Sequence, residues 1–193
     1  MPEILNETLV PSSSLLERLS GETPLSVSSC YQCKKCSSGC PLTFAMDLLP
    51  DQVIRLALLG QEERLLGCRT IWVCSACETC TTRCPNGVDI AGVMDWLKEE
   101  ALKTGKALPE VEVAAFHRFF LESIQAAGGR VDENRLLRRF TLFTLWRRPK
   151  VGELWENLKL GLKLFKRGRL SLGGPPKLKN QADMAKIFQH LKV

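Results

Sequence analysis

The sequence predicts an all-α fold, in which a helical module carries a duplicated cysteine motif and a helical extension follows it. Apolar residues recur at the three- and four-residue spacing of a helix in the segments outside the motifs. The segment between the two motifs is helical in pattern and shows no pairing of strands. The motif C-x-x-C-x-x-C-x-x-x-C-P occurs twice and accounts for eight of the nine cysteines.

An N-terminal arm, residues 1–25, precedes the module. Its segment SSSLLERLS, residues 12–20, predicts a short helix with a serine-rich cap. A Gly-Glu-Thr-Pro sequence follows and predicts a turn. The arm therefore contributes one helix ahead of the first cysteine motif.

The module, residues 26–105, contains three further predicted helices. Pro50 begins the first, which ends at Gly60, and residues 61–66 form a second short helix. Residues 88–105 form the third. The apolar faces are Val53, Ile54, Ala57 and Leu58 in the first helix, and Ile90, Val93, Met94, Leu97 and Ala101 in the third.

The extension, residues 106–193, is helical and basic. Its first helix, over residues 109–127, ends at a Gly-Gly pair. Further helices are predicted over residues 133–146, 153–168 and 182–188. From residue 130 onward, 16 Lys and Arg stand against 5 Asp and Glu, a balance of +11, whereas the preceding 129 residues carry 11 against 16, or −5.

Basic amphipathic helices of this kind have four interpretations: a docking surface for partner subunits, a membrane-surface helix, a nucleic-acid face, or a solvated charged face. We favour docking, because helices lying across another protein would bury Leu160, Leu164 and Phe165 and leave the lysines free. No apolar stretch approaches the roughly 20 residues that span a bilayer, so any membrane contact is expected to be peripheral. Nucleic acid is not expected as a partner.

The cysteine motifs carry the chemistry. Three cysteines at i, i+3 and i+6 lie on one compact loop, so their thiolates can occupy three corners of one iron-sulfur cube. The sequence therefore predicts two 4Fe-4S clusters, held close together in one folded unit. The ligands would be Cys30, Cys33, Cys36, Cys40, Cys74, Cys77, Cys80 and Cys84.

The last cysteine of each motif is expected to bind the neighbouring cluster. Each of these cysteines precedes a proline, which turns the backbone away and begins a new helix. The same crossed ligation holds for the bacterial ferredoxin motif, and we apply it here. The first cluster would take Cys30, Cys33, Cys36 and Cys84, and the second Cys74, Cys77, Cys80 and Cys40.

Two other uses of these cysteines fit the sequence less well. Structural zinc sites use pairs of C-x-x-C and have no need of a third and fourth cysteine in each motif. Disulfides are disfavoured because the chain begins without a secretory signal pattern, which makes a cytoplasmic location the expectation. Cys68 is expected to be a small buried apolar residue, and Tyr31, Trp72 and Trp96 to be core residues that keep water from the clusters.

The runs CYQCKKCSSGCP, AMDLLPDQVIRLALLG, TIWVCSACETCTTRCPNGVDIAGVMD and AFHRFFLESI resemble the C subunit of heterodisulfide reductase and its close relatives. The likeness extends from Cys30 through Leu172. Together with the helical pattern, it implies an α-helical ferredoxin-like two-cluster module. The resemblance also implies that the chain is an electron-transfer subunit. It would relay electrons from the flavin and iron-sulfur A subunit, often supplied by a hydrogenase or formate dehydrogenase, to the disulfide-reducing B subunit.

This interpretation agrees with the absence of a catalytic substrate site from the sequence. The chain has no Cys-Cys pair of the kind that the B subunit uses, no Gly-rich flavin or nicotinamide fingerprint and no P-loop. It would therefore be an oxidoreductase only as part of a complex. The alternative is the iron-sulfur subunit of a membrane-associated dehydrogenase of the glycerol-3-phosphate or glycolate oxidase type, in which the basic helices would meet lipid.

Overall fold

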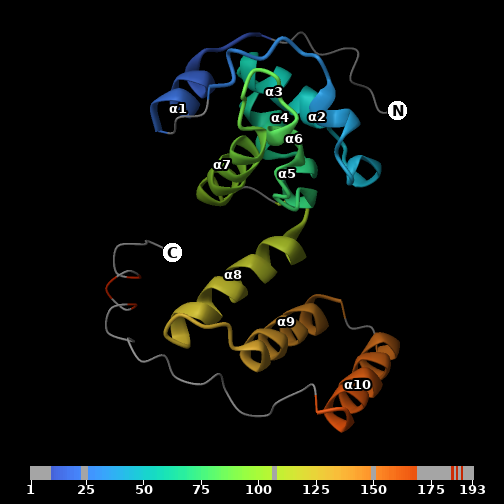
Figure 1. Ribbon diagram of the computed structural model, residues 1–193. Coiled ribbons are helices and arrows are strands. Elements are labelled where there is room, and N and C mark those ends of the chain that lie inside the picture. The colour runs from blue at the N-terminus through green and yellow to red at the C-terminus, as the bar shows by residue number, and fades with distance from the viewer. Residues whose placement is uncertain are drawn as a thin grey trace. The chain divides into compact units, whose positions relative to one another are not determined.

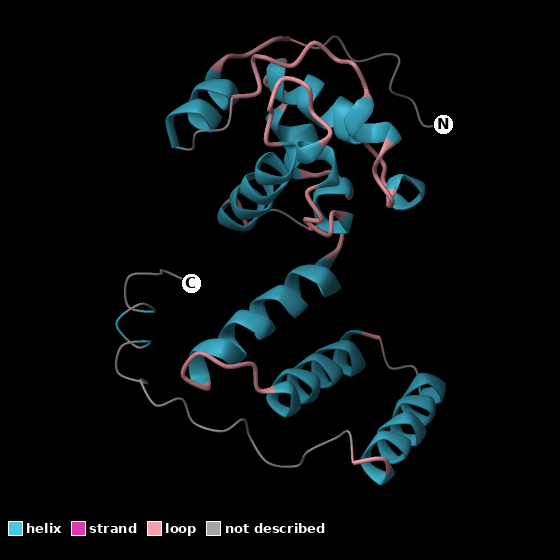
Figure 2. Ribbon diagram, in the orientation of Figure 1, coloured by secondary structure: helices cyan, strands magenta, loops and turns pink. Residues whose placement is uncertain are grey.

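The computed structural model describes residues 10–22, 26–105, 108–148 and 151–168, together with positions 184, 186 and 188. Helices joined by loops make up this part of the chain, which contains no strand (Figure 2). The all-α prediction is confirmed. The chain divides into two compact units, Met1–Val111 and Glu112–Val193.

The first unit gathers short helices around the two cysteine motifs (Figure 1). Three single-turn helices that the sequence did not predict lie in or directly before the motifs, and the longer helices surround them. In chain order the elements are α1 (Ser14–Glu22), α2 (Lys35–Ser38), the 3-10 turn η1 (Thr43–Ala45), α3 (Pro50–Leu58), α4 (Glu62–Leu66), α5 (Thr70–Val73), α6 (Thr79–Thr82) and α7 (Ile90–Lys103).

The core of this unit is formed by the apolar faces that helical spacing predicted. On α3, Val53, Ile54 and Ala57 are fully buried, and Leu58 is half-buried. All five predicted positions of α7 are buried as well. Each fully buried Val, Ile, Leu or Met side chain in this set stabilises the fold by about 1.5–3 kcal/mol relative to exposure. The two helices that follow the cysteine motifs therefore form the framework that holds the loops.

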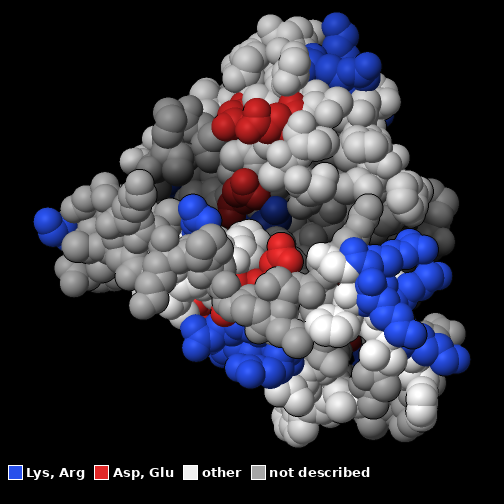
Figure 3. Space-filling model, turned by 60° about the horizontal axis from the view of Figure 1, so that its bottom comes forward, with Lys and Arg blue, Asp and Glu red and all other residues white. Residues whose placement is uncertain are grey.

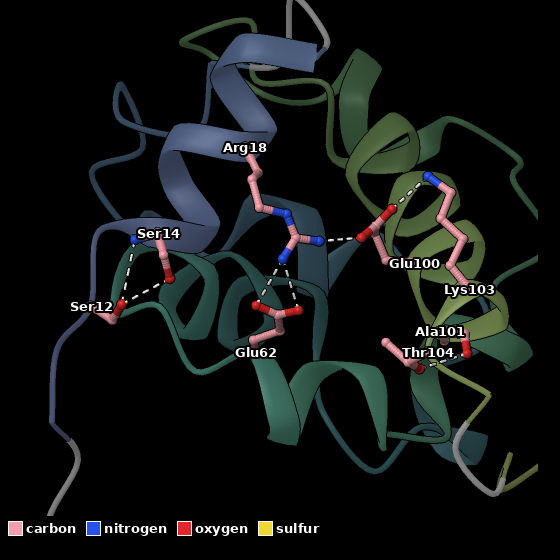
Figure 4. Close-up of polar contacts among 8 residues, drawn as sticks. All are labelled: Ser12, Ser14, Arg18, Glu62, Glu100, Ala101, Lys103 and Thr104. Carbon is pink, nitrogen blue, oxygen red and sulfur yellow. Dashed lines mark hydrogen bonds and ion pairs between the residues drawn. The ribbon is translucent and has the colours of Figure 1, made fainter.

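The N-terminal helix α1 is tied to the core by both packing and charge. Leu15 and Leu19 are fully buried. Arg18 reaches across to α4 and α7, where its guanidinium pairs with Glu62 at 3.0 Å and with the buried Glu100 (Figure 4). The same guanidinium lies 5.3 Å from the centre of the Trp96 ring. Helix α1 is therefore fixed to the module.

The second unit contains α8 (Val111–Ala126), α9 (Glu133–Arg147) and α10 (Val151–Lys166). Helices α8 and α9 bury a small core of Ala115, Phe119 and Leu136. Phe119 meets Phe143 edge-on at 5.7 Å between ring centres. Residues 128 and 129, the predicted Gly-Gly end of α8, have left-handed φ values of 68° and 107°. The helix predicted over residues 182–188 lies mostly outside the described residues.

One prediction about the core was wrong. Trp72 and Trp96 are 3% and 5% exposed, as expected, but Tyr31 is 61% exposed. Tyr31 lies between the first two cysteines of its motif, where the loop turns its side chain outward.

In the described part of the chain, no helix is both long enough and apolar enough to cross a bilayer.

Candidate metal centre

The two cysteine loops adopt the same unusual backbone. Gln32 and Lys34 flank the second cysteine of the first motif with φ values of 61° and 63°. Ala76 and Glu78 occupy the same places in the second motif with φ values of 51° and 57°. Residues other than glycine adopt this left-handed conformation at a cost, and they concentrate at binding sites. The repeat of these four angles indicates that both loops are shaped for the same kind of ligand.

This backbone is suited to an anion. In each loop a left-handed residue, Lys34 or Glu78, is followed directly by the right-handed first turn of α2 or α6. Successive N–H groups in such a turn form a concavity that binds anions, and iron-sulfur clusters occupy sites of this type. An oxidised cube with four thiolates carries a charge of about −2. The backbone and the soft thiol ligands therefore fit the predicted clusters.

A hydroxyl group anchors each loop to the helix that follows it. Ser37 Oγ accepts a hydrogen bond of 2.9 Å from the backbone N–H of Asp51, the second residue of α3. Thr81 Oγ1 accepts one of 3.1 Å from Ala91, the second residue of α7. Neither hydroxyl was predicted as part of the site, although both directly follow the third cysteine of their motif, a repeat that is visible in the sequence. The module therefore consists of two halves built on one plan.

The fourth cysteine of the first motif lies beside the second motif. Cys40 lines the same pocket as Cys74, Cys77 and Cys80. Burial raises the pKa of Cys74 above its ordinary value, and the Cys40 thiol adds to this increase, so the two groups interact electrostatically. The apolar part of the pocket wall comprises Leu42, Met46, Pro50, Ala91 and Met94. Ser75, Glu78 and Thr79 complete the wall, so the pocket combines four thiols with a partly apolar lining.

The reciprocal relationship is visible beside the first motif. Asn86, two residues after Cys84, donates a hydrogen bond to the carbonyl oxygen of Ser29, the residue before Cys30. Two thiols predicted for the first cluster also accept hydrogen bonds: Gln32 Nε2 donates to Cys30 Sγ at 3.4 Å, and the Val88 N–H donates to Cys84 Sγ at 3.3 Å. The fold therefore brings Cys84, the last cysteine of the second motif, near the first motif.

The thiols differ in their surroundings. Cys33 and Cys77 are exposed, and Cys36 is buried. Burial raises the pKa of Cys36, whereas the Thr79 hydroxyl lowers the pKa of Cys77. Within the described residues, the side chains do not gather into a preformed group of three or more metal ligands. Binding of a metal group and final ordering of its ligands are commonly coupled in proteins.

Cys68 is separate from the two motifs and behaves as predicted. Its side chain is 4% exposed. Burial raises the pKa of this thiol to about 11, and the Asp47 carboxylate adds to the effect. A thiol that stays protonated in an apolar environment is a packing residue rather than a ligand.

Comparison with known proteins places this arrangement among iron-sulfur proteins. Residues 26–88 match the family model of the 4Fe-4S dicluster domain. The chain is 32% identical over 130 residues to the C subunit of the ferredoxin/F(420)H(2)-dependent CoB-CoM heterodisulfide reductase of Methanosarcina acetivorans, covering 66% of this chain and 76% of the relative. It is 33% identical over 84 residues to the C subunit of the H(2):CoB-CoM heterodisulfide,ferredoxin reductase of Methanothermobacter marburgensis, covering 44% and 45%.

A third relative, the iron-sulfur C subunit of the CoB-CoM heterodisulfide reductase of Methanopyrus kandleri, is 33% identical over 84 residues, covering 44% of each chain. The chain thus spans about half the length of several curated relatives that it matches. The matched domain and these relatives indicate two 4Fe-4S clusters, so the predicted cofactors are confirmed. The assignment of individual cysteines to each cluster stays a prediction.

Proposed function

Because the chain belongs to the family of heterodisulfide reductase C subunits, we propose that it relays single electrons through two 4Fe-4S clusters within a heterodisulfide reductase-type complex. The clusters, when bound, supply the one-electron chemistry. The observation that carries the proposal is the pocket in which Cys40 from one motif joins Cys74, Cys77 and Cys80 from the other. Such interleaving requires the two clusters to lie in one folded unit, as a relay needs.

The proposed ligand sets follow this interleaving. One cluster is held by Cys30, Cys33, Cys36 and Cys84, and the other by Cys74, Cys77, Cys80 and Cys40. The position of Cys40 supports the second set, and the hydrogen bond from Asn86, just after Cys84, to Ser29, just before Cys30, supports the first.

The remaining residues of the site control its environment. Met46 and Met94 contribute apolar surface to the pocket that Cys40 shares with the second motif. At the proposed first cluster, donors from Gln32 and from the Val88 backbone reach the sulfurs of Cys30 and Cys84. Hydrogen bonds to sulfur and burial are the means by which a protein adjusts the potential of a cluster. In this proposal the chain binds and tunes its clusters, and substrate chemistry belongs to other subunits.

The partners in this proposal are the A and B subunits, with a hydrogenase or formate dehydrogenase module as a further electron source. The names of relatives include H(2) and formate alongside the heterodisulfide. Residues 26–105 would form the cluster module and residues 106–193 the docking extension, with residues 1–25 as an arm. Exposed apolar side chains of α9 and α10 support docking: Leu137, Leu142, Trp146, Trp155, Leu160, Leu162 and Phe165.

Iron and sulfide content of the anaerobically purified chain tests the relay. We expect about eight irons and eight sulfides per chain and, after dithionite reduction, EPR signals of two interacting 4Fe-4S clusters. The variant Cys68→Ser serves as the control and should retain all the iron, because Cys68 is not a proposed ligand. Stoichiometric zinc in place of iron would overturn the proposal.

The matched variants Cys40→Ser and Cys84→Ser test the crossed assignment. By Mössbauer spectroscopy, Cys40→Ser should alter the cluster of the second motif and Cys84→Ser that of the first. The opposite pattern would show that each motif supplies all four ligands to one cluster. Copurification with the A and B subunits tests the complex, and a chain that purifies from its native source without them would contradict it.

A second candidate is the iron-sulfur subunit of a membrane-associated dehydrogenase. The observation that favours it is the combination of exposed aromatic and basic residues on the second unit, including Trp155, Lys159 and Phe165 of α10. Figure 3 shows Lys and Arg gathered into patches on the face in view. Flotation with anionic vesicles discriminates, because this function predicts binding that salt weakens.

A further inference from the structure

A largely buried lysine contacts the second cysteine loop. Lys98 lies on α7, and its Nζ donates a hydrogen bond of 3.2 Å to the carbonyl oxygen of Cys74. The same ammonium pairs with Asp95 at 2.9 Å. Only 12% of the Lys98 side chain is exposed, whereas 53% of the Asp95 side chain is. The cation is therefore largely withdrawn from water, and the anion that faces it is largely solvated.

The positive charge of Lys98 indicates its role better than the hydrogen bond that it donates. A carbonyl oxygen can be satisfied by a neutral donor, and burying a lysine is costly because the ion loses hydration. A buried charge is also screened less by salt than an exposed one. Lys98 thus places a weakly screened positive charge directly beside a residue that we propose as a cluster ligand.

The two halves of the module differ at this point. The hydrogen bond of Ser37 with Asp51 corresponds to that of Thr81 with Ala91, so Asp51 of α3 and Ala91 of α7 are equivalent positions in the two halves. Seven residues beyond these aligned positions lie Leu58 in the first half and Lys98 in the second. The second half therefore has a cation where the first half has a half-buried apolar side chain.

We propose that Lys98 raises the reduction potential of the cluster in the second cysteine loop, which makes the two clusters of the relay unequal. The inference rests on the proposed function, since it concerns a cluster held by Cys74. Reduction adds one electron from the donor to the cluster and increases its negative charge by one, and no bond is formed or broken. A nearby fixed cation stabilises the reduced form more than the oxidised form, because the reduced form carries the larger negative charge.

An EPR-monitored redox titration of the full, cluster-loaded chain tests this role. In Lys98→Met the one-electron reduction equilibrium of one cluster should become about tenfold less favourable, a fall of about 59 mV in its midpoint, while the other midpoint stays unchanged. Lys98→Arg should restore the wild-type midpoint because it keeps the charge. Lys103→Met, which removes a more exposed lysine from the same helix, is the control and should leave both midpoints in place.

The variant Asp95→Asn gives a test of opposite sign. Removing this exposed carboxylate leaves the Lys98 charge less compensated, so the same midpoint should rise. Because Asp95 also lies near the loop, this rise supports the inference only together with a fall in a Lys98 variant, and Lys98→Gln supplies that fall if Lys98→Met does not assemble. Unchanged midpoints in loaded Lys98→Met or Lys98→Gln would overturn the inference and leave the relay intact. A wild-type chain that binds no iron-sulfur cluster would overturn the relay and the inference together.

Discussion

The side chain of Arg83 packs against Gly39, the residue at the same place in the other cysteine motif. Each residue directly precedes the last cysteine of its motif. A Cβ atom on Gly39 would lie 2.7 Å from Cδ of Arg83 and 3.0 Å from its Cζ. Helices α2 and α6 meet here, so this contact joins the two halves of the module.

Gly39→Ala should destabilise the cluster-loaded chain by no more than about 1 kcal/mol, because the methyl group displaces only the end of the exposed, flexible Arg83 side chain from the junction. Anaerobic chemical denaturation measures the change. The matched control is Gly21→Ala on the exposed face of α1, where a Cβ meets nothing within 4 Å. This control should be neutral or stabilising by up to about 1 kcal/mol, since alanine favours a helix over glycine. Equal stability of Gly39→Ala and the wild type would show that Arg83 relocates without cost.

Arg18→Gln should loosen the N-terminal helix from the module. It removes the pairs with Glu62 and Glu100, and it leaves the 8% exposed Glu100 with Lys103 as its remaining cationic partner at 2.6 Å. We expect a loss of about 1–2 kcal/mol, limited by the 36% exposure of Arg18. Glu17→Gln, at an exposed position of the same helix, is the control and should change stability by less than about 0.5 kcal/mol. Hydrogen exchange of α1 should increase in Arg18→Gln alone.

Ser37→Ala should weaken the attachment of the first loop to α3. Ser37 is 8% exposed, and its hydroxyl accepts the N–H of Asp51, which would be left buried without this partner. The expected cost is about 1–2 kcal/mol. Ser38→Ala is the control, because Ser38 is exposed and its hydroxyl donates only within its own turn, to the Lys35 carbonyl oxygen. If both variants unfold at the same denaturant concentration, the Ser37 hydroxyl does not anchor the loop.

Cys68 should give the chain an alkaline dependence of stability. The pKa of its thiol is about 11 in the folded chain against an ordinary value of 9.0, chiefly because of burial. The folded state therefore holds this proton more tightly than the unfolded state, and its contribution is complete below about pH 9 and lost as the pH rises toward 11. Cys68→Ala should lack this part of the decline. The difference in unfolding free energy between the two chains at pH 8 and pH 10.5 measures it, and a constant difference would contradict the assignment.

Alkylation provides an independent check of Cys68. At pH 8 its thiol should react slowly with iodoacetamide in the folded chain, because it is both buried and protonated. Denaturant should restore the rate of an ordinary cysteine. Rapid modification of folded chain at Cys68 would show that this part of the core opens readily.

The local features of this chain could be predicted from its sequence alone. Helical spacing identified the buried faces of α3 and α7, because residues three and four apart lie on one side of a helix whatever surrounds it. The duplicated motif identified two 4Fe-4S clusters, because ligand type and spacing are properties of a short segment. Because Cys68 lies outside both motifs, the sequence also predicted that it is a buried packing residue, as the structure shows.

The contacts between segments that are distant in the chain became visible only in the folded structure. Arg18 pairs with Glu100, and Lys98 contacts the Cys74 carbonyl oxygen, although no short repeat in the sequence relates these residues. The outward position of Tyr31 likewise has no signal in the local sequence. The left-handed conformation of four loop residues could not be predicted from the sequence either, because Gln, Lys, Ala and Glu have no local preference for it. These contacts depend on how helices pack against one another, and that packing reflects the free energy of the whole unit rather than of any one segment.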